Sequence, residues 1–261
     1  MKVWTVDAFT QRPFAGNPAA IAIVNQFPTN TTCQNLAAEM NLSETVFVKP
    51  LTENHFHIRW FTPLVEIELC GHATLAAAHI LFQEKRVNSD KMSFDSLSGK
   101  LWVTKQDGLI TLDFPLQKTG PVLDTHDFQE LLDIEVISAE KALDDILIEV
   151  SENNLLRYEP NLEKISRLDC RGLIMTAKSS KDYDFISRFF APRVGVLEDP
   201  VTGSAHCKLA DYWQKKLNKT HFLAYQASKR GGELKLTVAE DRVYIAGNAV
   251  TVMQGEWIIP I

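Results

Sequence analysis

Residues 69–85 read LCGHATLAAAHILFQEK, and this stretch decides between the classes of fold open to the chain. A helix predicted from Gly71 would be apolar on more than one face, because Ala, Leu and Ile recur in every turn. Such a helix is usually buried against several partners. Residues 203–216, GSAHCKLADYWQKK, share this character and are also entered through a glycine. The sequence therefore predicts two strand-rich domains, each wrapped around one central helix.

Short strand-like runs surround both helical segments. A further helix is predicted over residues 31–40, with Thr31 as its cap. The acidic stretch between residues 124 and 163 is interpreted as a solvated face. β-branched and aromatic content predicts strands at residues 3–9, 20–24, 45–48, 56–61, 101–104, 109–114, 145–150, 172–177, 185–190, 223–226, 234–238 and 243–246.

A domain boundary is predicted at PLQKTGP, residues 115–121, where two prolines and a glycine bracket a polar stretch. The order of elements before this boundary is repeated after it. Both halves have several strands and one alanine-rich helix, which is an internal resemblance of architecture. The expected fold class is accordingly α+β, with two barrel-like halves.

Composition and charge exclude several classes of function. The 261 residues carry a formal net charge of -6, so no broad cationic field favours nucleic acid or an anionic membrane as partner. The opening MKVWTVDAFTQRPF has no apolar run suited to a signal peptide or a spanning helix, so we expect a cytoplasmic protein. Four cysteines far apart do not predict a disulfide framework.

The first candidate for chemistry is Glu44, in the segment NLSETVFV at residues 41–48. Apolar neighbours would bury it in part and suit it to general acid/base work. A plain solvated glutamate on a turn fits the same residues, and this is the commoner case.

The second candidate is the helix start at Gly71 and His72. Unpaired backbone N–H groups and the positive end of the helix dipole suit this position to an anion. The same dipole would favour a neutral His72, able to act as a hydrogen-bonding group or proton relay. A buried cap with a hydrogen-bonded histidine is the alternative.

The third candidate is EDPVTGSA, residues 198–205, in which Asp199, Thr202, Gly203 and Ser204 surround the start of the second helix. These are ordinary cap residues taken singly. Two similar helix starts, one in each half, favour a shared ligand site between the domains.

No metal or organic cofactor is expected, because the chain has no HExxH or CxxC spacing and no Walker A, GxGxxG or GxSxG motif. One carboxylate, a histidine, an aspartate and two anion-holding helix ends suit proton abstraction next to a carboxylate. A small carboxylate is therefore the expected substrate.

Six ordered motifs then make the chain resemble the PhzF-like family of phenazine biosynthesis, which shares the diaminopimelate epimerase fold. The likeness covers nearly the whole length. The motifs are VDAFTQRPFAGNPAAIAIV (6–24), AAEMNLSETVFV (37–48), IRWFTPLVEIELCGHATLAAAHIL (58–81), LDFP (112–115), DFISRFFAPRVGVLEDPVTGSAHCKLADYW (184–213) and VYIAGNAVTVMQGEW (243–257).

The resemblance implies a cofactor-independent isomerase. Glu44 would be the general acid/base, supported by His72, Asp199 and Ser204, with Gly71 and Gly203 as backbone donors. It also implies two pseudo-symmetric, mostly antiparallel barrels, each around a central helix, and a homodimer. The expected domains are residues 1–115, completed by a C-terminal strand at 248–261, and residues 116–247.

Two other functions stay open. Related epimerases and racemases use two cysteines on opposite faces of the substrate, and Cys70 stands at the first such place. The matching stretch at residues 198–200 has no thiol, and Cys207 lies a turn further along its helix, which argues against two-thiol chemistry. The remaining alternative is a non-catalytic protein that binds small anions.

Overall fold

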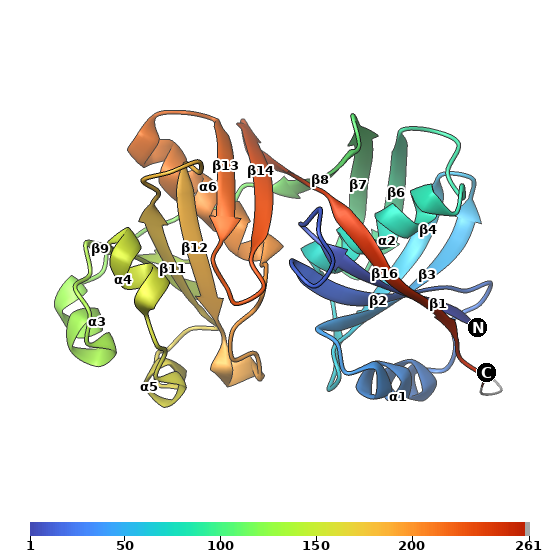
Figure 1. The fold of residues 1–261 in the computed structure, drawn as a ribbon, viewed down its shortest axis with the longest axis horizontal. Coiled ribbons are helices and arrows are strands. Elements are labelled where there is room, and N and C mark those ends of the chain that lie inside the picture. The colour runs from blue at the N-terminus through green and yellow to red at the C-terminus, as the bar shows by residue number, and fades with distance from the viewer. Residues whose placement is uncertain (259–261) are drawn as a thin grey trace. The chain divides into compact units, whose positions relative to one another are not determined.

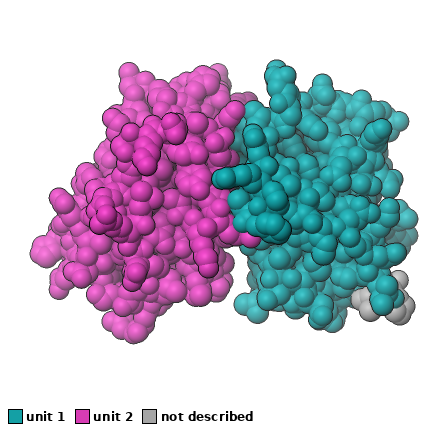
Figure 2. Space-filling view, in the orientation of Figure 1, with its two compact units in different colours: residues 1–113, 245–261 teal, residues 114–244 magenta. Residues whose placement is uncertain are grey.

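The computed structural model describes residues 1–258, so the last three residues of the strand expected at 248–261 lie outside the described part. The chain forms two compact units, coloured separately in Figure 2. Unit 1 comprises residues 1–113 and the chain from residue 245 onward, and unit 2 comprises residues 114–244. No helix within residues 1–258 is long and apolar enough to cross a membrane.

Unit 1 is built on a sheet with the strand order β16-β1-β2-β3-β4-β6-β7-β8 (Figure 1). Two full helices, α1 and α2, and the short strand β5, which pairs with β4, complete it. The elements are β1 (Lys2–Ala8), β2 (Asn17–Ile23), α1 (Asn30–Met40), β3 (Glu44–Thr52), β4 (His55–Phe61), β5 (Glu66–Ile67), α2 (Gly71–Gln83), β6 (Lys91–Ser96), β7 (Gly99–Gln106), β8 (Leu109–Pro115) and β16 (Ala249–Glu256).

The core of unit 1 is helix α2. Its residues Ala73, Leu75, Ala76, Ala77, Ala78, Ile80 and Leu81 are all fully buried. The helix packs against β1, β2, β3 and β16, so the sheet wraps around it. Because strands surround the helix on several sides, its side chains are apolar on more than one face. Their small size, alanine above all, lets the strands approach closely.

Unit 2 repeats this plan with the sheet order β15-β14-β13-β12-β11-β10-β9. Its central helix α6 stacks Trp213 on Phe185 of β12 at 5.5 Å between ring centroids. The elements are α3 (Thr125–Leu132), β9 (Ser138–Ala142), β10 (Asp145–Glu149), α4 (Glu152–Arg157), α5 (Leu162–Ser166), β11 (Leu173–Lys178), β12 (Phe185–Phe190), the 3-10 turn η1 (Pro192–Val194), α6 (Gly203–Leu217), β13 (His221–Gln226), β14 (Gly232–Ala239) and β15 (Arg242–Gly247).

The two units share one order of strand pairings. In unit 1 the neighbours from β1 to β7 pair antiparallel, parallel, antiparallel, parallel and antiparallel. In unit 2 the neighbours from β9 to β14 pair in the same order. The central helix follows the fourth strand of each series, which is β4 before α2 and β12 before α6. The expected α+β fold of two similar halves is confirmed.

Two local expectations are wrong. The cap of α1 is Thr29, whose side chain accepts from the Thr32 backbone N–H, whereas Thr31 lies inside the helix. The acidic stretch between residues 124 and 163 is more than a solvated face. Its helices and strands bury the apolar side chains Phe128, Leu132, Leu155 and others in the core of unit 2.

Candidate active site

Glu44 is the first residue of β3 in unit 1, and it lies at the same sheet end as the start of β2. Parallel pairing sets Glu44 beside Ala19 of β2. Its side chain is only 12% exposed. The commoner alternative of a solvated turn residue therefore does not hold, and the carboxylate sits largely inside the protein.

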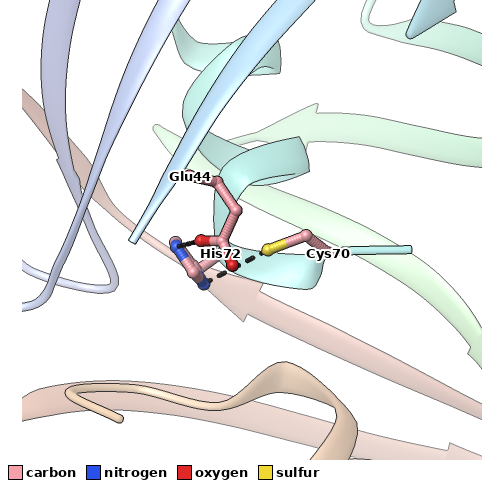
Figure 3. Close-up of side chains that lie close together, drawn as sticks. All are labelled: Glu44, Cys70 and His72. Carbon is pink, nitrogen blue, oxygen red and sulfur yellow. Dashed lines mark hydrogen bonds and ion pairs between the residues drawn. The ribbon is translucent and has the colours of Figure 1, made fainter. Parts of the chain in front are cut away.

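His72 lies in the first turn of α2 and faces Glu44 (Figure 3). Its Nε2 is 2.7 Å from Oε2 of Glu44, and the imidazole is 5% exposed. The two atoms are at ion-pair distance without the alignment of a hydrogen bond, and neither has another hydrogen-bond partner among the described residues. On its other side, Nδ1 of His72 contacts Nδ2 of Asn17 at 3.1 Å and Sγ of Cys70 at 3.4 Å.

The protonation of His72 differs from the expectation. Burial would lower the pKa of His72, but the neighbouring Cys70 and Glu44 outweigh it and hold the pKa well above its ordinary value. The expected neutral His72 is therefore wrong, because a carboxylate 2.7 Å away outweighs the positive end of the helix dipole.

Cys70 directly precedes α2 and points at the same pair (Figure 3). Burial, reinforced by the charge of Glu44, raises the pKa of the Cys70 thiol to about 11. The sulfur is consequently a protonated thiol at neutral pH and a poor base or nucleophile.

Two amide side chains that were not predicted from the sequence contact site residues, Asn17 in unit 1 and Gln226 in unit 2. The hydroxyl of Ser43 donates to Oδ1 of Asn17 at 3.0 Å, and Asn17, which is fully buried, contacts His72. Only the motif AGNPAA offered any signal for Asn17, since a single asparagine at the start of a strand has no characteristic spacing.

Unit 2 brings the third candidate group together at the start of α6. The hydroxyl of Thr202 donates to Oδ2 of Asp199 at 2.5 Å. The buried amide of Gln226, on β13, accepts from the Thr202 backbone N–H at 2.8 Å and donates to the Asp199 carbonyl at 2.7 Å. Gln226 thus fixes the turn that leads into the helix, and no sequence motif pointed to it.

Gly203 and Ser204 form the first turn of α6, where Ser204 lies beside a charged network. Arg171 makes a two-point contact with the carboxylate of Asp145, at 3.0 and 2.6 Å, and its Nη2 is 3.4 Å from Oγ of Ser204. Lys208, buried on α6, forms an ion pair with the same Asp145. Through Ser204 and Lys208, this network links the first two turns of α6 to Arg171 and Asp145.

The predicted residues therefore form two groups. Glu44, Gly71 and His72 lie together in unit 1, with Cys70 and Asn17 beside them. Asp199, Thr202, Gly203 and Ser204 lie at the start of α6 in unit 2. In unit 1 the geometry places a largely buried carboxylate beside an imidazole at a helix start that no side chain caps, an arrangement that suits proton transfer on an anionic substrate.

Comparison with known proteins places the chain in a family. The family described as phenazine biosynthesis-like protein matches residues 6–255. A protein of Halalkalibacterium halodurans named as an uncharacterized isomerase is 47% identical over 263 residues, which cover 98% of both chains.

Solved structures agree with this assignment. A PhzF-family phenazine biosynthesis protein of Enterococcus faecalis superposes with a TM-score of 0.92 at 39% identity, covering 99% of both chains. A probable proline racemase of Agrobacterium radiobacter has a TM-score of 0.69 at 10% identity, covering 99% of this chain and 93% of that one, and shows the shared fold alone. The chain therefore belongs to the PhzF, or phenazine biosynthesis-like, family and is one of its isomerases.

Proposed function

We propose that this isomerase shifts a proton within a small carboxylate substrate by general acid/base chemistry without a cofactor, and that Glu44 is the group that moves the proton. The observation that carries the proposal is the buried carboxylate of Glu44 held 2.7 Å from His72. A carboxylate in this setting is largely shielded from water and lies beside an imidazole that can orient it for proton transfer.

The proposed reaction has two steps. The Glu44 carboxylate takes a proton from a carbon next to an electron-withdrawing group, and the electrons of the broken C–H bond form a new double bond. The resulting carboxylic acid returns the proton to another carbon of the same π system, and the electrons of the old double bond form the new C–H bond. The outcome is a migrated double bond, and Glu44 ends as it began.

Binding of the substrate is assigned to the glycine-entered helix starts. No side chain caps the helix starts at Gly71 and Gly203, so their backbone N–H groups can serve an anion, and a glycine lets a carboxylate approach closely. Thr202 and Ser204 add hydroxyls at the start of α6, and Asp199 is assigned a role in orienting the substrate. These roles in unit 2 are part of the proposal.

A Cys70-dependent epimerase is the second candidate, favoured by the contact between its sulfur and His72 at 3.4 Å. A thiol pKa of about 11 opposes it, as does the lack of a second thiol within residues 198–200. A non-catalytic protein that binds small anions is the third, and only turnover separates it from the first.

The test begins with a thermal-shift screen of small carboxylates to find ligands. Each ligand is then incubated with enzyme in D₂O and followed by proton NMR. The wild type should convert a ligand to its isomer, with deuterium entering the product or substrate hydrogen returning internally. Glu44→Gln should fold normally and lose at least ~10²-fold in turnover, as is typical of removing a general base.

Glu39→Gln is the matched control, because Glu39 is exposed and lies on α1. Turnover near the wild-type rate in Glu44→Gln would contradict the assignment and make His72 or Asp199 the leading base. A ligand that binds to the wild type and to both variants but is converted by none of them would favour the anion-binding alternative.

A further inference from the structure

The proposed reaction leaves Cys70 without a role, although its thiol is buried next to the base and its partner. The donor atoms of Glu44, Cys70 and His72 all lie within 4.8 Å of one another. They come from the start of β3, the residue before α2 and the first turn of α2, and the three side chains point toward one another (Figure 3). Fixed elements of unit 1 thus hold a carboxylate, a thiol and an imidazole around one point.

The donor atoms lie in a range from which a tetrahedral cation site can be assembled. Bonds of ~2.0–2.3 Å to zinc place nitrogen and oxygen ligands about 3.3 Å apart, and nitrogen and sulfur ligands about 3.6 Å apart. In this chain Nε2 of His72 is 2.7 Å from Glu44, its other ring nitrogen, Nδ1, is 3.4 Å from Cys70, and one donor atom of each residue lies within 4.8 Å of the other two. Small side-chain movements would therefore bring one donor atom from each residue onto a common cation.

The charges also suit a divalent cation. A Glu44 carboxylate and a Cys70 thiolate would cancel the charge of a doubly charged ion, which removes most of the cost of burying it. Oε2 of Glu44 and Nε2 of His72 are buried and lack an aligned hydrogen bond, so a cation would satisfy both. Binding would release two protons, one from the thiol of Cys70 and one from the imidazolium of His72, because thiolate and neutral imidazole are the forms that ligate a cation.

We propose that Glu44, Cys70 and His72 also form an inhibitory site for a thiophilic divalent cation, and that Zn²⁺ is the ion this donor set suits best. A set of sulfur, nitrogen and carboxylate oxygen is typical of zinc and unlike the all-oxygen sites of Mg²⁺ and Ca²⁺. Three protein ligands leave a fourth position open to water or a substrate carboxylate. A cation bound here occupies the lone pairs with which Glu44 accepts a proton, so it competes with catalysis and does not assist it.

Cation binding can be measured without any substrate, so its outcome is independent of the proposed reaction. The full chain, cleared of metal by a chelator, is titrated with Co²⁺ and followed by absorption. Ligation should produce a near-ultraviolet thiolate-to-cobalt band together with visible bands of a four-coordinate ion, and Zn²⁺ should abolish both. A Co²⁺ complex of the wild type without the thiolate band would overturn the proposal, and this measurement needs no variant.

Variants then identify the thiol. Cys70→Ser should lose the thiolate band and weaken Zn²⁺ binding by calorimetry at least about ten-fold, the lower end of the loss seen when a zinc site is perturbed. Cys170→Ser is the matched control, since Cys170 is a half-buried free thiol in unit 2 and should leave the band unchanged. Equal Zn²⁺ affinity in Cys70→Ser and wild type would refute the site. Once a substrate is known, Zn²⁺ should inhibit the wild type and a chelator should restore its rate.

Discussion

Nε2 of His72 lies 2.7 Å from Oε2 of Glu44, and both side chains are almost completely buried. A histidine and a carboxylate at this distance stabilise each other's charged forms, while burial alone would disfavour both. The raised pKa of His72 shows that the neighbouring charges prevail over burial. The pair thus places a carboxylate and an imidazole side by side in the interior of unit 1.

Replacement of Cys70 separates the two enzymatic candidates. We expect Cys70→Ser to lose far less turnover than the ~10²-fold that marks a missing acid/base group, because serine can still contact His72. An epimerase that uses the thiol as one of its two bases would lose nearly all activity. The measurement is turnover of a screened carboxylate together with the stereochemistry of its product. Loss of nearly all activity in a normally folded Cys70→Ser variant would contradict the proposed mechanism and favour the Cys70-dependent epimerase.

Removal of metal tests the expectation that the reaction needs no cofactor. Exhaustive dialysis against a chelator should leave turnover unchanged, since the proposed steps use only the Glu44 carboxylate and hydrogen-bond donors of the chain. If the preparation contains Zn²⁺, turnover should rise on chelation, because the cation competes for Glu44. Metal content is measured in the same samples by mass spectrometry. A loss of turnover that Zn²⁺ or Mg²⁺ restores would contradict both expectations.

The central helices could be predicted from the sequence, and the peripheral elements could not. Helices α2 and α6 begin at Gly71 and Gly203 as expected, since a long apolar pattern entered through glycine has few alternative structures. The short helices α3, α4 and α5 escaped detection, because their few apolar residues, such as Phe128 and Leu155, stand among many charged ones. Tertiary packing within unit 2, which no local pattern shows, makes them part of its core.

The site was predictable where a motif carried the residue. Glu44 and His72 were identified through their segments, but their mutual distance depends on how β3 and α2 pack, which no local pattern encodes. Asn17 and Gln226 could not be identified, since neither has a charge or a characteristic spacing. Both act through hydrogen bonds to residues far away in the sequence, and this is visible only in the folded chain.

The buried amide of Gln226 should matter for stability. Gln226→Met keeps the length of the side chain and removes the amide oxygen that accepts from the buried Thr202 N–H, together with the N–H that donates to the Asp199 carbonyl. Each buried group left unpaired costs about 1–3 kcal/mol, so the free energy of unfolding should fall by at least this amount. Denaturation by urea measures it.

Gln254→Met provides the control for this substitution, because Gln254 is exposed on β16. Its effect should stay within about 0.5 kcal/mol, as for most surface changes. Equal stability of the two variants would show that water replaces the contacts of Gln226.

Finally, His206 should make unit 2 sensitive to acid. This residue of α6 is fully buried, and burial lowers the pKa of its imidazole to about 4, although its Nδ1 lies 2.8 Å from the Thr202 carbonyl oxygen and donates to it. The unfolded chain therefore binds a proton at His206 below about pH 6.5, whereas the folded chain does so only near pH 4. Stability is complete above pH 6.5 and declines as the pH falls, by about 3 kcal/mol at pH 4.

The variant His206→Asn isolates this contribution from that of the carboxylates, which titrate in the same range. Asparagine can still donate to the Thr202 carbonyl but has no group that takes up a proton. The free energy of unfolding, measured by urea denaturation between pH 7 and pH 4, should fall less steeply in the variant, with a difference between the two curves approaching about 3 kcal/mol. Because the slopes are compared, any loss of packing at pH 7 does not affect the result. Parallel curves for wild type and variant would mean that His206 already carries its proton in the folded protein or is reached by water, and its burial would then not control the acid sensitivity of unit 2.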